Sequence, residues 1–431
     1  MMKKKYFLNA NIIDPQNSID EVGGLIINEN GLIEAVGKKV NTNNIPTREK
    51  YIDLKGKYII PGIVDMRVFV GEPGYEYKEN FRTLSDAALS GGVTSVVSMP
   101  NTSPVIDNVS MVDFLKRRGR DKASINIFPT ATLTKNTEGK QMTEFGLLKR
   151  KGIIAFTDGL KTVQDPQVMM RIMNFANQSN SLIMQHAEDN ILSYEGLINE
   201  GEISTRLGLK GIPFLAEKII VERDLSFLEE YNCRYHISQI SSEKTILIIK
   251  KAKQEGKIFS SGVSINNLSL NENDIGDFKT FLKLSPPLRT EKDRVSLVSG
   301  INDGTIDVIV SDHKPEDEES KRLTFAKAAT GASGVETLLP LALELYHNKS
   351  VKLSRLISTM TNNPSNILGI DKGTLGVGKD ADICVIDINK PWIVKKNELK
   401  SKSKNTPIED RKLQGQVTRT FVKGDIAFER N

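Results

Sequence analysis

The sequence has few cysteines and no long apolar run. Cys233 and Cys384 are the only cysteines among 431 residues, too few for a disulfide framework, so we expect a reducing compartment. No stretch approaches the ~20 apolar residues of a membrane helix. The basic start at residues 3–5 is soon followed by Asn9 and Asn11, which interrupt the apolar core that a signal peptide needs. These absences predict a cytoplasmic protein without a membrane segment.

Histidine is also scarce, and its four copies are His186, His236, His313 and His347. Imidazole nitrogen is a preferred ligand of protein-bound zinc, so a histidine-rich metal centre has few side chains to draw on. His347 lies on a helix-like stretch away from any polar motif. The sequence therefore disfavours a metal centre built mainly from histidines.

The charge has no strong excess of one sign. The chain has 59 basic and 54 acidic residues, a net charge of +5, and the two signs are interspersed, so we predict no nucleic-acid partner. Hydrophobic content of 39% and charged content of 26% fit a globular protein with one large and one small domain. The run Lys400–Lys404, followed by Asn405, is expected to be a solvated loop.

Both ends of the chain carry short β segments. Residues 25–28 and 32–36 flank an Asn-Glu-Asn-Gly turn, which predicts a hairpin. A strand-like segment recurs at residues 383–386. We therefore predict one small composite β domain built from residues 1–58 and 368–431.

The middle of the chain alternates apolar runs with helical patterns. Phe81–Ser90 is a predicted helix, closed by the Gly-Gly pair that follows it. The strand-like runs are Val93–Met99, Ile153–Thr157, Leu182–His186 and Thr305–Asp312. This alternation predicts an α/β fold, most simply a (β/α)8 TIM barrel over residues 59–367. His186 and Asp312 end two of the runs, at the edge where such barrels carry their chemistry.

The segment Pro61–Gly74 resembles the opening strand of dihydroorotases, in the amidohydrolase superfamily, whose motif is P-G-x-x-D-x-H-x-H-x-R-E-P-G. Residues i and i+2 of a strand share a face, so the two histidines of that motif present two imidazoles to a metal. Here Arg67 and Phe69 stand in their places, and Gly71 replaces the arginine. A cation at residue 67 repels a divalent ion, and a phenyl ring cannot bind one.

Two further motifs concern the substrate of the family. Met99–Pro104 resembles M-P-N-T-x-P, in which the asparagine, here Asn101, helps to bind the substrate carboxylate together with the arginine that Gly71 replaces. Leu284–Arg289 resembles N-P-P-L-R with Ser285 in place of the asparagine. The resemblance makes Asn101 and Arg289 candidate substrate-binding residues.

Several motifs concern the metal. Phe156–Gly159 resembles F-T-D-D-G with one aspartate lost, and Asp158 is either a ligand or a loop cap. His186–Asp189 matches H-x-E-D, and as a lone histidine His186 is more often structural than a ligand. In Arg234–Ser242, Gln239 stands where the family's L-H-I-x-H-V-S-T motif has a ligand histidine. Gln239 can offer an oxygen, which is a poor substitute for imidazole at zinc.

The segment Ser311–Glu316 resembles D-H-A-P-H. Asp312 matches the aspartate that binds metal and acts as general acid and base on the attacking water. Lys314 replaces a small residue, and Glu316 replaces the final histidine. The whole resemblance extends from about Ile13 to Phe428.

The resemblance implies a dihydroorotase-like protein of pyrimidine biosynthesis. Because Arg67, Phe69 and Gln239 replace three ligands, we predict no zinc and a vestigial role for Asp312, whose carboxylate Arg67 would neutralise. The chain would then be a pseudoenzyme, as a noncatalytic partner or assembly subunit of aspartate carbamoyltransferase, and homo-oligomeric.

The alternative is an active cyclic-amide hydrolase with one zinc held by His186, Asp158 and Asp312, since three ligands plus water form a catalytic zinc site. A small-molecule sensor that uses the old pocket is a third hypothesis. Metal content distinguishes the first two hypotheses.

Overall fold

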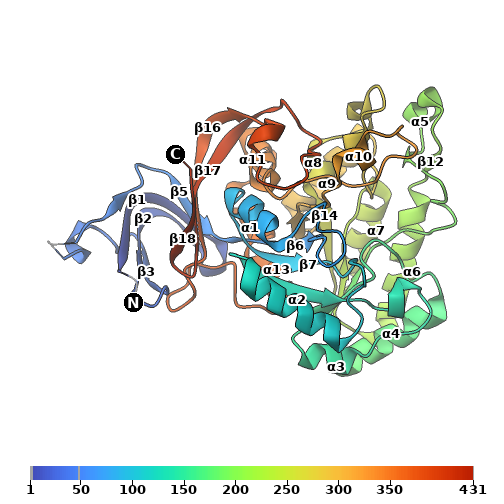
Figure 1. Cartoon of the computed structure of the whole chain (residues 1–431), viewed down its shortest axis with the longest axis horizontal. Coiled ribbons are helices and arrows are strands. Elements are labelled where there is room, and N and C mark those ends of the chain that lie inside the picture. Colours follow the sequence, from blue (N-terminus) through green and yellow to red (C-terminus); the bar gives the residue numbers. More distant parts are fainter. Residues whose placement is uncertain (1–2, 47–48, 431) are drawn as a thin grey trace.

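The computed structural model describes residues 3–46 and 49–430. A β-rich layer made from both termini lies beside a larger barrel surrounded by helices (Figure 1). The fold class predicted from the sequence is therefore confirmed.

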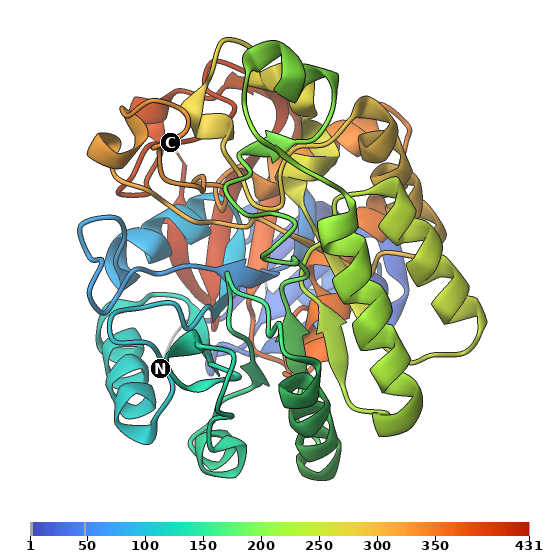
Figure 2. The ribbon, with the colours of Figure 1, turned by 90° about the vertical axis from the view of Figure 1, so that its right-hand side faces the viewer.

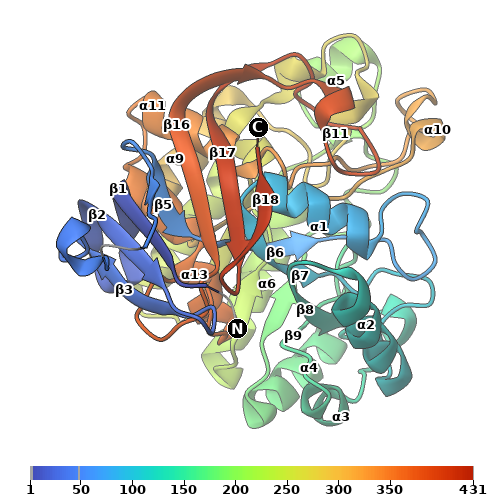
Figure 3. The same cartoon turned by 60° about the vertical axis from the view of Figure 1, so that its left-hand side comes forward.

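The β-rich layer is a mixed sheet in the order β18-β17-β16-β5-β1-β2-β3, with β4 paired to β1. Its strands are β1 (Lys5–Asp14), β2 (Ile19–Ile27), β3 (Ile33–Gly37), β4 (Ile52–Asp53), β5 (Tyr58–Pro61), β16 (Ile383–Ile393), β17 (Lys412–Val422) and β18 (Asp425–Glu429). The hairpin between β2 and β3 forms as predicted, because the side chain of Asn28 accepts hydrogen bonds from the amides of Asn30 and Leu32. Figure 3 brings this sheet forward, with β17 and β18 beside α1.

The barrel has eight parallel strands in chain order. They are β6 (Ile63–Val68), β7 (Val93–Ser98), β8 (Asn126–Ala131), β9 (Ala155–Phe156), β10 (Ile183–Gln185), β13 (Tyr235–Ile237), β14 (Ser260–Ser264) and β15 (Val308–Val310). A parallel bridge between Val68 and His313 joins the last strand to the first. That bridge brings the segments around Arg67 and Asp312 together, although 245 residues separate them.

Helices surround the barrel (Figure 2). The longer helices are α1 (Phe81–Ser90), α2 (Val109–Lys122), α4 (Pro166–Ser179), α6 (Leu215–Tyr231), α7 (Glu243–Gln254), α9 (Glu291–Asp303), α11 (Leu338–His347) and α12 (Leu353–Met360). The shorter elements are α3 (Phe145–Arg150), α5 (Glu202–Leu207), α8 (Ile265–Ser269), α10 (Glu318–Lys321), α13 (Asn362–Leu368), β11 (Ile198–Asn199) and β12 (Gly211–Ile212), besides single 3-10 turns. Helix α1 has the predicted bounds, because Asn80 caps its start and Gly91 follows its last residue.

One hydrophobic core joins the two parts of the molecule. Cys384 and Ile386 of β16 and Val417 of β17 pack in the same buried cluster as Ile63 and Val93 of the barrel strands. Because the terminal sheet shares this core, we expect it to depend on the barrel for its stability. The domain boundaries at residues 58 and 367 remain a prediction, and β5, which starts at Tyr58, belongs to the terminal sheet.

The run Lys400–Lys404 with Asn405 is not the solvated loop that its composition predicts. Ser401, Ser403 and Asn405 are 1%, 7% and 3% exposed. Hydrogen-bond acceptors elsewhere in the chain bind the polar groups of this segment. We call residues 399–405 the strap. Across 3–46 and 49–430, no helix is long and apolar enough to cross a membrane.

Candidate functional site

Arg67 and Asp312 form a buried ion pair at the mouth of the barrel. Nε of Arg67 donates to Oδ1 of Asp312 at 3.0 Å, and a second guanidinium nitrogen donates to the carbonyl oxygen of Gly159 at 3.2 Å. The guanidinium carbon lies 5.3 Å from the centre of the Phe69 ring. Arg67 is 1% exposed, so this pair is shielded from water. The contact predicted between the two residues is confirmed.

Burial lowers the pKa of Arg67, and the neighbouring carboxylate of Asp312 opposes that change. A guanidinium stays protonated in proteins because its ordinary pKa is far above neutral pH. Asp312 adopts a left-handed backbone with φ of 50°, which costs free energy in a residue with a side chain. The carboxylate of Asp312 is thus held against the buried guanidinium of Arg67.

Asp158 caps a neighbouring loop. Its two carboxylate oxygens accept from the amide of Thr134 at 3.0 Å and from the hydroxyl of Thr134 at 2.6 Å. Burial raises the pKa of Asp158 to about 6. Of the two roles that the sequence left open, the structure shows the loop cap.

His186 and Gln239 follow the neighbouring strands β10 and β13. Nε2 of His186 lies 3.4 Å from the hydroxyl of Ser285 and 3.8 Å from Oε2 of Glu188. Nδ1 of His186 and both amide atoms of Gln239 are buried and have no hydrogen-bond partner among the described residues.

The donor set does not fit a zinc centre of the family type. Over the part of the chain that the structure describes, no three His, Cys, Asp or Glu side chains form a group able to hold a metal. His186, Asp158 and Asp312 are thus not gathered as the alternative hypothesis requires. Arg67 bonds the Asp312 carboxylate that would otherwise bind the metal, and Thr134 bonds that of Asp158.

A cavity of about 260 Å³ opens at the barrel mouth. It is lined by Phe69, Gly71, Tyr75, Lys78, Asn101, Leu160, Lys314, Pro315 and Glu316. Oε2 of Glu316 lies 2.6 Å from Nζ of Lys78, and Oε1 lies 3.1 Å from Nζ of Lys314. Glu316 is 3% exposed, so the carboxylate of this mouth triad has both of its cations supplied from within the chain.

Gly71 forms a turn at this mouth. Its φ is 75°, and an added Cβ atom would lie 2.7 Å from the carbonyl oxygen of Glu79 and 2.8 Å from that of Tyr75. The backbone therefore requires glycine at the position where the family motif has arginine.

The two candidate substrate-binding residues differ in their surroundings. Asn101 lines the cavity, and its amide donates to the carbonyl oxygen of Asp158 at 3.0 Å. Arg289 is 4% exposed and donates to Ser241 at 3.0 Å, to the side chain of Asn199 at 2.8 Å and to the carbonyl oxygen of Ile212 at 2.9 Å. Its guanidinium joins three segments of the fold. A substrate role for either residue remains a prediction.

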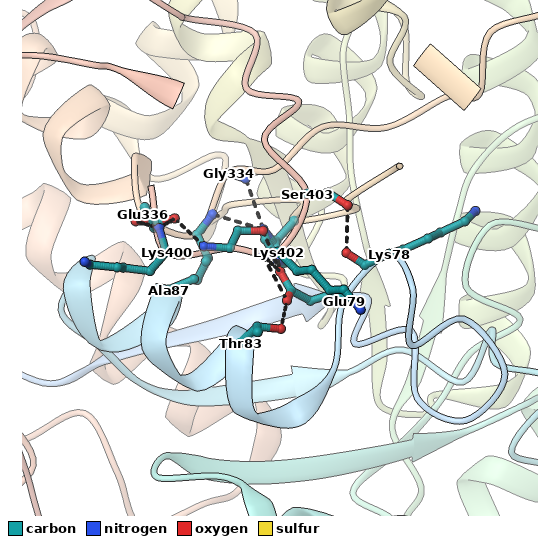
Figure 4. A network of polar contacts seen from close by, with 12 residues as sticks. Lys78, Glu79, Thr83, Ala87, Gly334, Glu336, Lys400, Lys402 and Ser403 are labelled. Carbon is teal, nitrogen blue, oxygen red and sulfur yellow. Dashed lines mark hydrogen bonds and ion pairs between the residues drawn. The ribbon is translucent and has the colours of Figure 1, made fainter. Parts of the chain in front are cut away.

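Two glutamates, Glu79 and Glu336, bond the strap to the segments before α1 and α11, and Glu79 is buried whereas Glu336 is partly exposed (Figure 4). Glu336 accepts from the amides of Lys400 at 2.8 Å and Ser401 at 2.9 Å. Glu79 accepts from the hydroxyl of Ser401 and from the amide of Lys402. Oε2 of Glu79 also lies 3.5 Å from Nε2 of His313. The residue after Asp312 is thus connected to the C-terminal part of the chain.

The charge of Glu79 depends on these contacts. Burial alone would raise the pKa of Glu79, but the contacts with His313, Ser401 and Thr83 hold it below its ordinary value. Sequence reasoning missed Glu79 and Lys78 because neither stands in a chemical motif. The replacements Lys314 and Glu316 together were the one available sign of the ion pairs at the mouth.

Comparison with known proteins identifies the family of the chain. A family profile described as "Dihydro-orotase-like" matches residues 56–245. The chain is 41% identical over 418 residues to a dihydroorotase of Syntrophus aciditrophicus (strain SB), covering 97% of each protein. It is 38% identical over 424 residues to a dihydroorotase of Ehrlichia canis (strain Jake), covering 98% of this chain and 94% of the relative.

Solved structures support the same fold. An L-hydantoinase (dihydropyrimidinase) from Arthrobacter aurescens superposes with a TM-score of 0.87 at 22% identity, over 98% of this chain and 96% of the other. A dihydropyrimidinase from Brevibacillus agri NCHU1002 gives 0.85 at 21% identity, over 99% and 95%. Identity at this level shows the fold alone. The full-length identity to the two relatives shows more, and this chain belongs to the dihydroorotase family.

Proposed function

We propose that this chain is a noncatalytic member of the dihydroorotase family that acts as a partner or assembly subunit of aspartate carbamoyltransferase in pyrimidine biosynthesis. The buried pair of Arg67 and Asp312 is the observation that carries the proposal. A divalent ion at Asp312 would have to displace a buried guanidinium or sit beside it, and both cost free energy.

Loss of the metal would remove the activated water. A bound metal lowers the pKa of its water and so supplies hydroxide near neutral pH. Asp312 alone, acting as a general base, would contribute roughly 10²–10⁴-fold. Its carboxylate is also engaged by Arg67, so even this contribution is reduced.

The partner role rests on the family resemblance and on what the chain retains. The whole fold is kept while the chemistry at Arg67, Phe69, Gln239 and Glu316 differs from the family motifs. A chain that keeps its fold while its site chemistry changes is suited to an assembly role. We propose that it is homo-oligomeric and that it binds aspartate carbamoyltransferase.

An active cyclic-amide hydrolase is the second candidate, and the comparisons favour it. The relatives that match over 97–98% of the chain are named dihydroorotases, and His186 and Asp312 are present. In this case one zinc would be held by His186, Asp158 and Asp312 after Arg67 and the Asp158 cap had moved away. Lewis-acid activation of water is the chemistry that this ion would supply.

Two measurements on the purified chain distinguish the candidates. We expect zinc well below one per chain after mild chelation, and no turnover of dihydroorotate or carbamoyl aspartate with added zinc. About one zinc per chain together with turnover would establish the second candidate. Co-elution with the aspartate carbamoyltransferase of the same organism in size-exclusion chromatography tests the partner role, and separate elution of the two proteins contradicts it.

A further inference from the structure

A groove of about 470 Å³ lies between α2, the start of β8 and the turn that joins β17 to β18. Its apolar floor consists of Leu115, Ile125, Ile127, Phe128 and Pro129, and its cations are Lys116, Arg120 and Lys423. The floor lies at the start of β8, and Asp312 lies two residues beyond the end of β15. Because barrel strands are parallel, the groove is near the opposite end of the barrel from the candidate site.

The groove exists because α2 carries a glycine where it faces the sheet. Gly119 is buried, and Ile127 and Phe128 beneath it are only partly covered. An added Cβ atom at residue 119 would meet the side chain of Ile127 at 3.5 Å, an ordinary contact distance. A methyl group therefore fits at residue 119, and a larger side chain would fill the groove.

Positive charge is concentrated around this groove, although the two signs are interspersed along the whole sequence. The exposed cations of α2, α3 and the residue after α3 are Lys116, Arg117, Arg120, Lys122, Lys149, Arg150 and Lys151. The acidic residues of α2 are Asp113 and Asp121, which pair with Lys151 and Arg120 at 3.0 Å each.

The cations at the groove itself have few acidic partners. Nζ of Lys116 donates to the carbonyl oxygen of Lys151 at 3.0 Å, and no carboxylate contacts it among the described residues. The ammonium of Lys423 has no ion-pair partner within residues 3–46 and 49–430. Helix dipoles explain basic residues in the last turns of α2 and α3, but Lys116 and Lys423 lie outside those turns.

We propose that this groove docks an acidic segment of a partner protein. One apolar side chain of that segment would lie on Ile127 and Phe128, with carboxylates beside Lys116, Arg120 and Lys423. The cations of the groove favour an acidic segment, and the apolar floor favours one apolar side chain within that segment. Grooves for single-stranded nucleic acid use several aromatic faces for stacking, whereas Phe128 is the one aromatic residue lining this floor.

The proposal does not depend on the loss of catalysis, because the groove and the candidate site use different ends of the barrel. If the purified chain proved to hold zinc, the docking proposal would stand unchanged. Failure of the docking assay would in turn leave the noncatalytic assignment unchanged.

Fluorescence anisotropy with labelled peptides tests the proposal on the full chain. The probe is an acidic peptide with a central leucine, compared with the same peptide carrying glycine at the centre. An oligothymidylate and a nucleoside triphosphate are the competing probes. We expect the leucine peptide to bind at least about tenfold more tightly than the glycine peptide, as burial of one apolar side chain predicts.

Two kinds of variant locate the binding. The double variant Lys116→Glu with Lys423→Glu should lower the affinity for the leucine peptide at least about tenfold, because two close charge pairs are lost. The control is Lys244→Glu with Lys327→Glu, which makes the same charge change on exposed lysines elsewhere and should leave the affinity unchanged. Gly119→Leu should weaken it by filling the groove, while Gly119→Ala should leave it unchanged. Circular dichroism checks that each variant is folded.

Several results would overturn the proposal. They are equal binding of the leucine and glycine peptides, tighter binding of the oligonucleotide or the nucleotide, and equal loss in both pairs of lysine variants. Absence of peptide binding at millimolar concentration would overturn it as well.

Discussion

Residue 67 supplies a positive charge where the dihydroorotase motif has a histidine ligand. Without a cation, Asp312 would be an isolated carboxylate at 8% exposure, and such a group is costly to bury. The guanidinium offers both charge and hydrogen bonds, and a second nitrogen is satisfied by the carbonyl oxygen of Gly159. Arg67 therefore supplies the counterion of Asp312 from within the chain.

Arg67→Ala should lower the free energy of unfolding by about 1–3 kcal/mol, because it leaves Asp312 without its buried partner. Urea unfolding followed by circular dichroism gives the value. Phe69→Leu, which changes the neighbouring apolar side chain and leaves the ion pair, is the matched control and should cost less.

The double variant Arg67→Ala with Asp312→Asn should recover much of that loss, since neither charge is then left alone. If the cost of the double variant equals the sum of the two single costs, the residues are not coupled and Arg67 does not replace metal charge.

Lys321, at the end of α10, is another buried cation. Its Nζ donates to the carbonyl oxygens of Thr280 at 2.9 Å and Ala329 at 2.6 Å, and burial lowers its pKa to about 7. The unfolded chain keeps the lysine proton up to a pH of about 10.4, so between these values the unfolded state binds more protons. Stability contributed by this group therefore rises with pH above 7.

Lys321→Met should flatten this dependence. Between pH 7 and pH 9 the unfolding free energy of the variant should rise by about 1–3 kcal/mol less than that of the parent chain. Urea midpoints at each pH provide the measurement, and Lys244→Met, at an exposed lysine, should retain the parent slope. Parallel slopes for Lys321→Met and the parent chain would contradict the prediction.

At the scale of elements, the strap shows how acceptors far along the chain decide whether a polar segment is buried. Its Lys-Ser-Lys-Ser-Lys-Asn composition is typical of a solvated loop, yet Glu79 and Glu336 supply the acceptors that bury it. No property of residues 399–405 alone could predict these partners. Helix α1 was predictable because both of its end signals are local.

Removal of one strap acceptor should loosen the whole segment. In Glu79→Ala, hydrogen exchange of the amides of Lys400, Ser401 and Lys402 should accelerate at least about tenfold, corresponding to ~1.4 kcal/mol of lost local stability. Glu76→Ala, at a nearby glutamate whose side chain accepts from the amide of Gly74, serves as the control. Unchanged exchange in Glu79→Ala would show that Glu79 does not stabilise the strap.

For the whole molecule, periodicity and motif resemblance predicted the barrel and the sheet from both termini. The same information predicted that Arg67 meets Asp312, because the motif placed both at the barrel mouth. It did not predict the cap on Asp158, the three-segment role of Arg289 or the triad of Lys78, Glu316 and Lys314. These depend on loop conformations, which tertiary contacts fix.

The shared core predicts that the two parts of the chain unfold together. Trp392, the single tryptophan, lies on β16, and its indole donates to the carbonyl oxygen of Gly415 at 2.9 Å. Its fluorescence therefore reports on the terminal sheet, while far-ultraviolet circular dichroism is dominated by the helices around the barrel. Coincident urea transitions by both probes are expected. Two separated midpoints would show that the terminal sheet is an independent unit.

The glycine turn at residue 71 makes the change from the family motif difficult to reverse one mutation at a time. An arginine at this position would press on the carbonyl oxygen of Glu79, whose side chain anchors the strap. A histidine at residue 67 would meanwhile leave Asp312 without its counterion. Each single substitution toward the family motif therefore passes through a less stable protein, so restoring that motif would require compensating changes elsewhere in the chain.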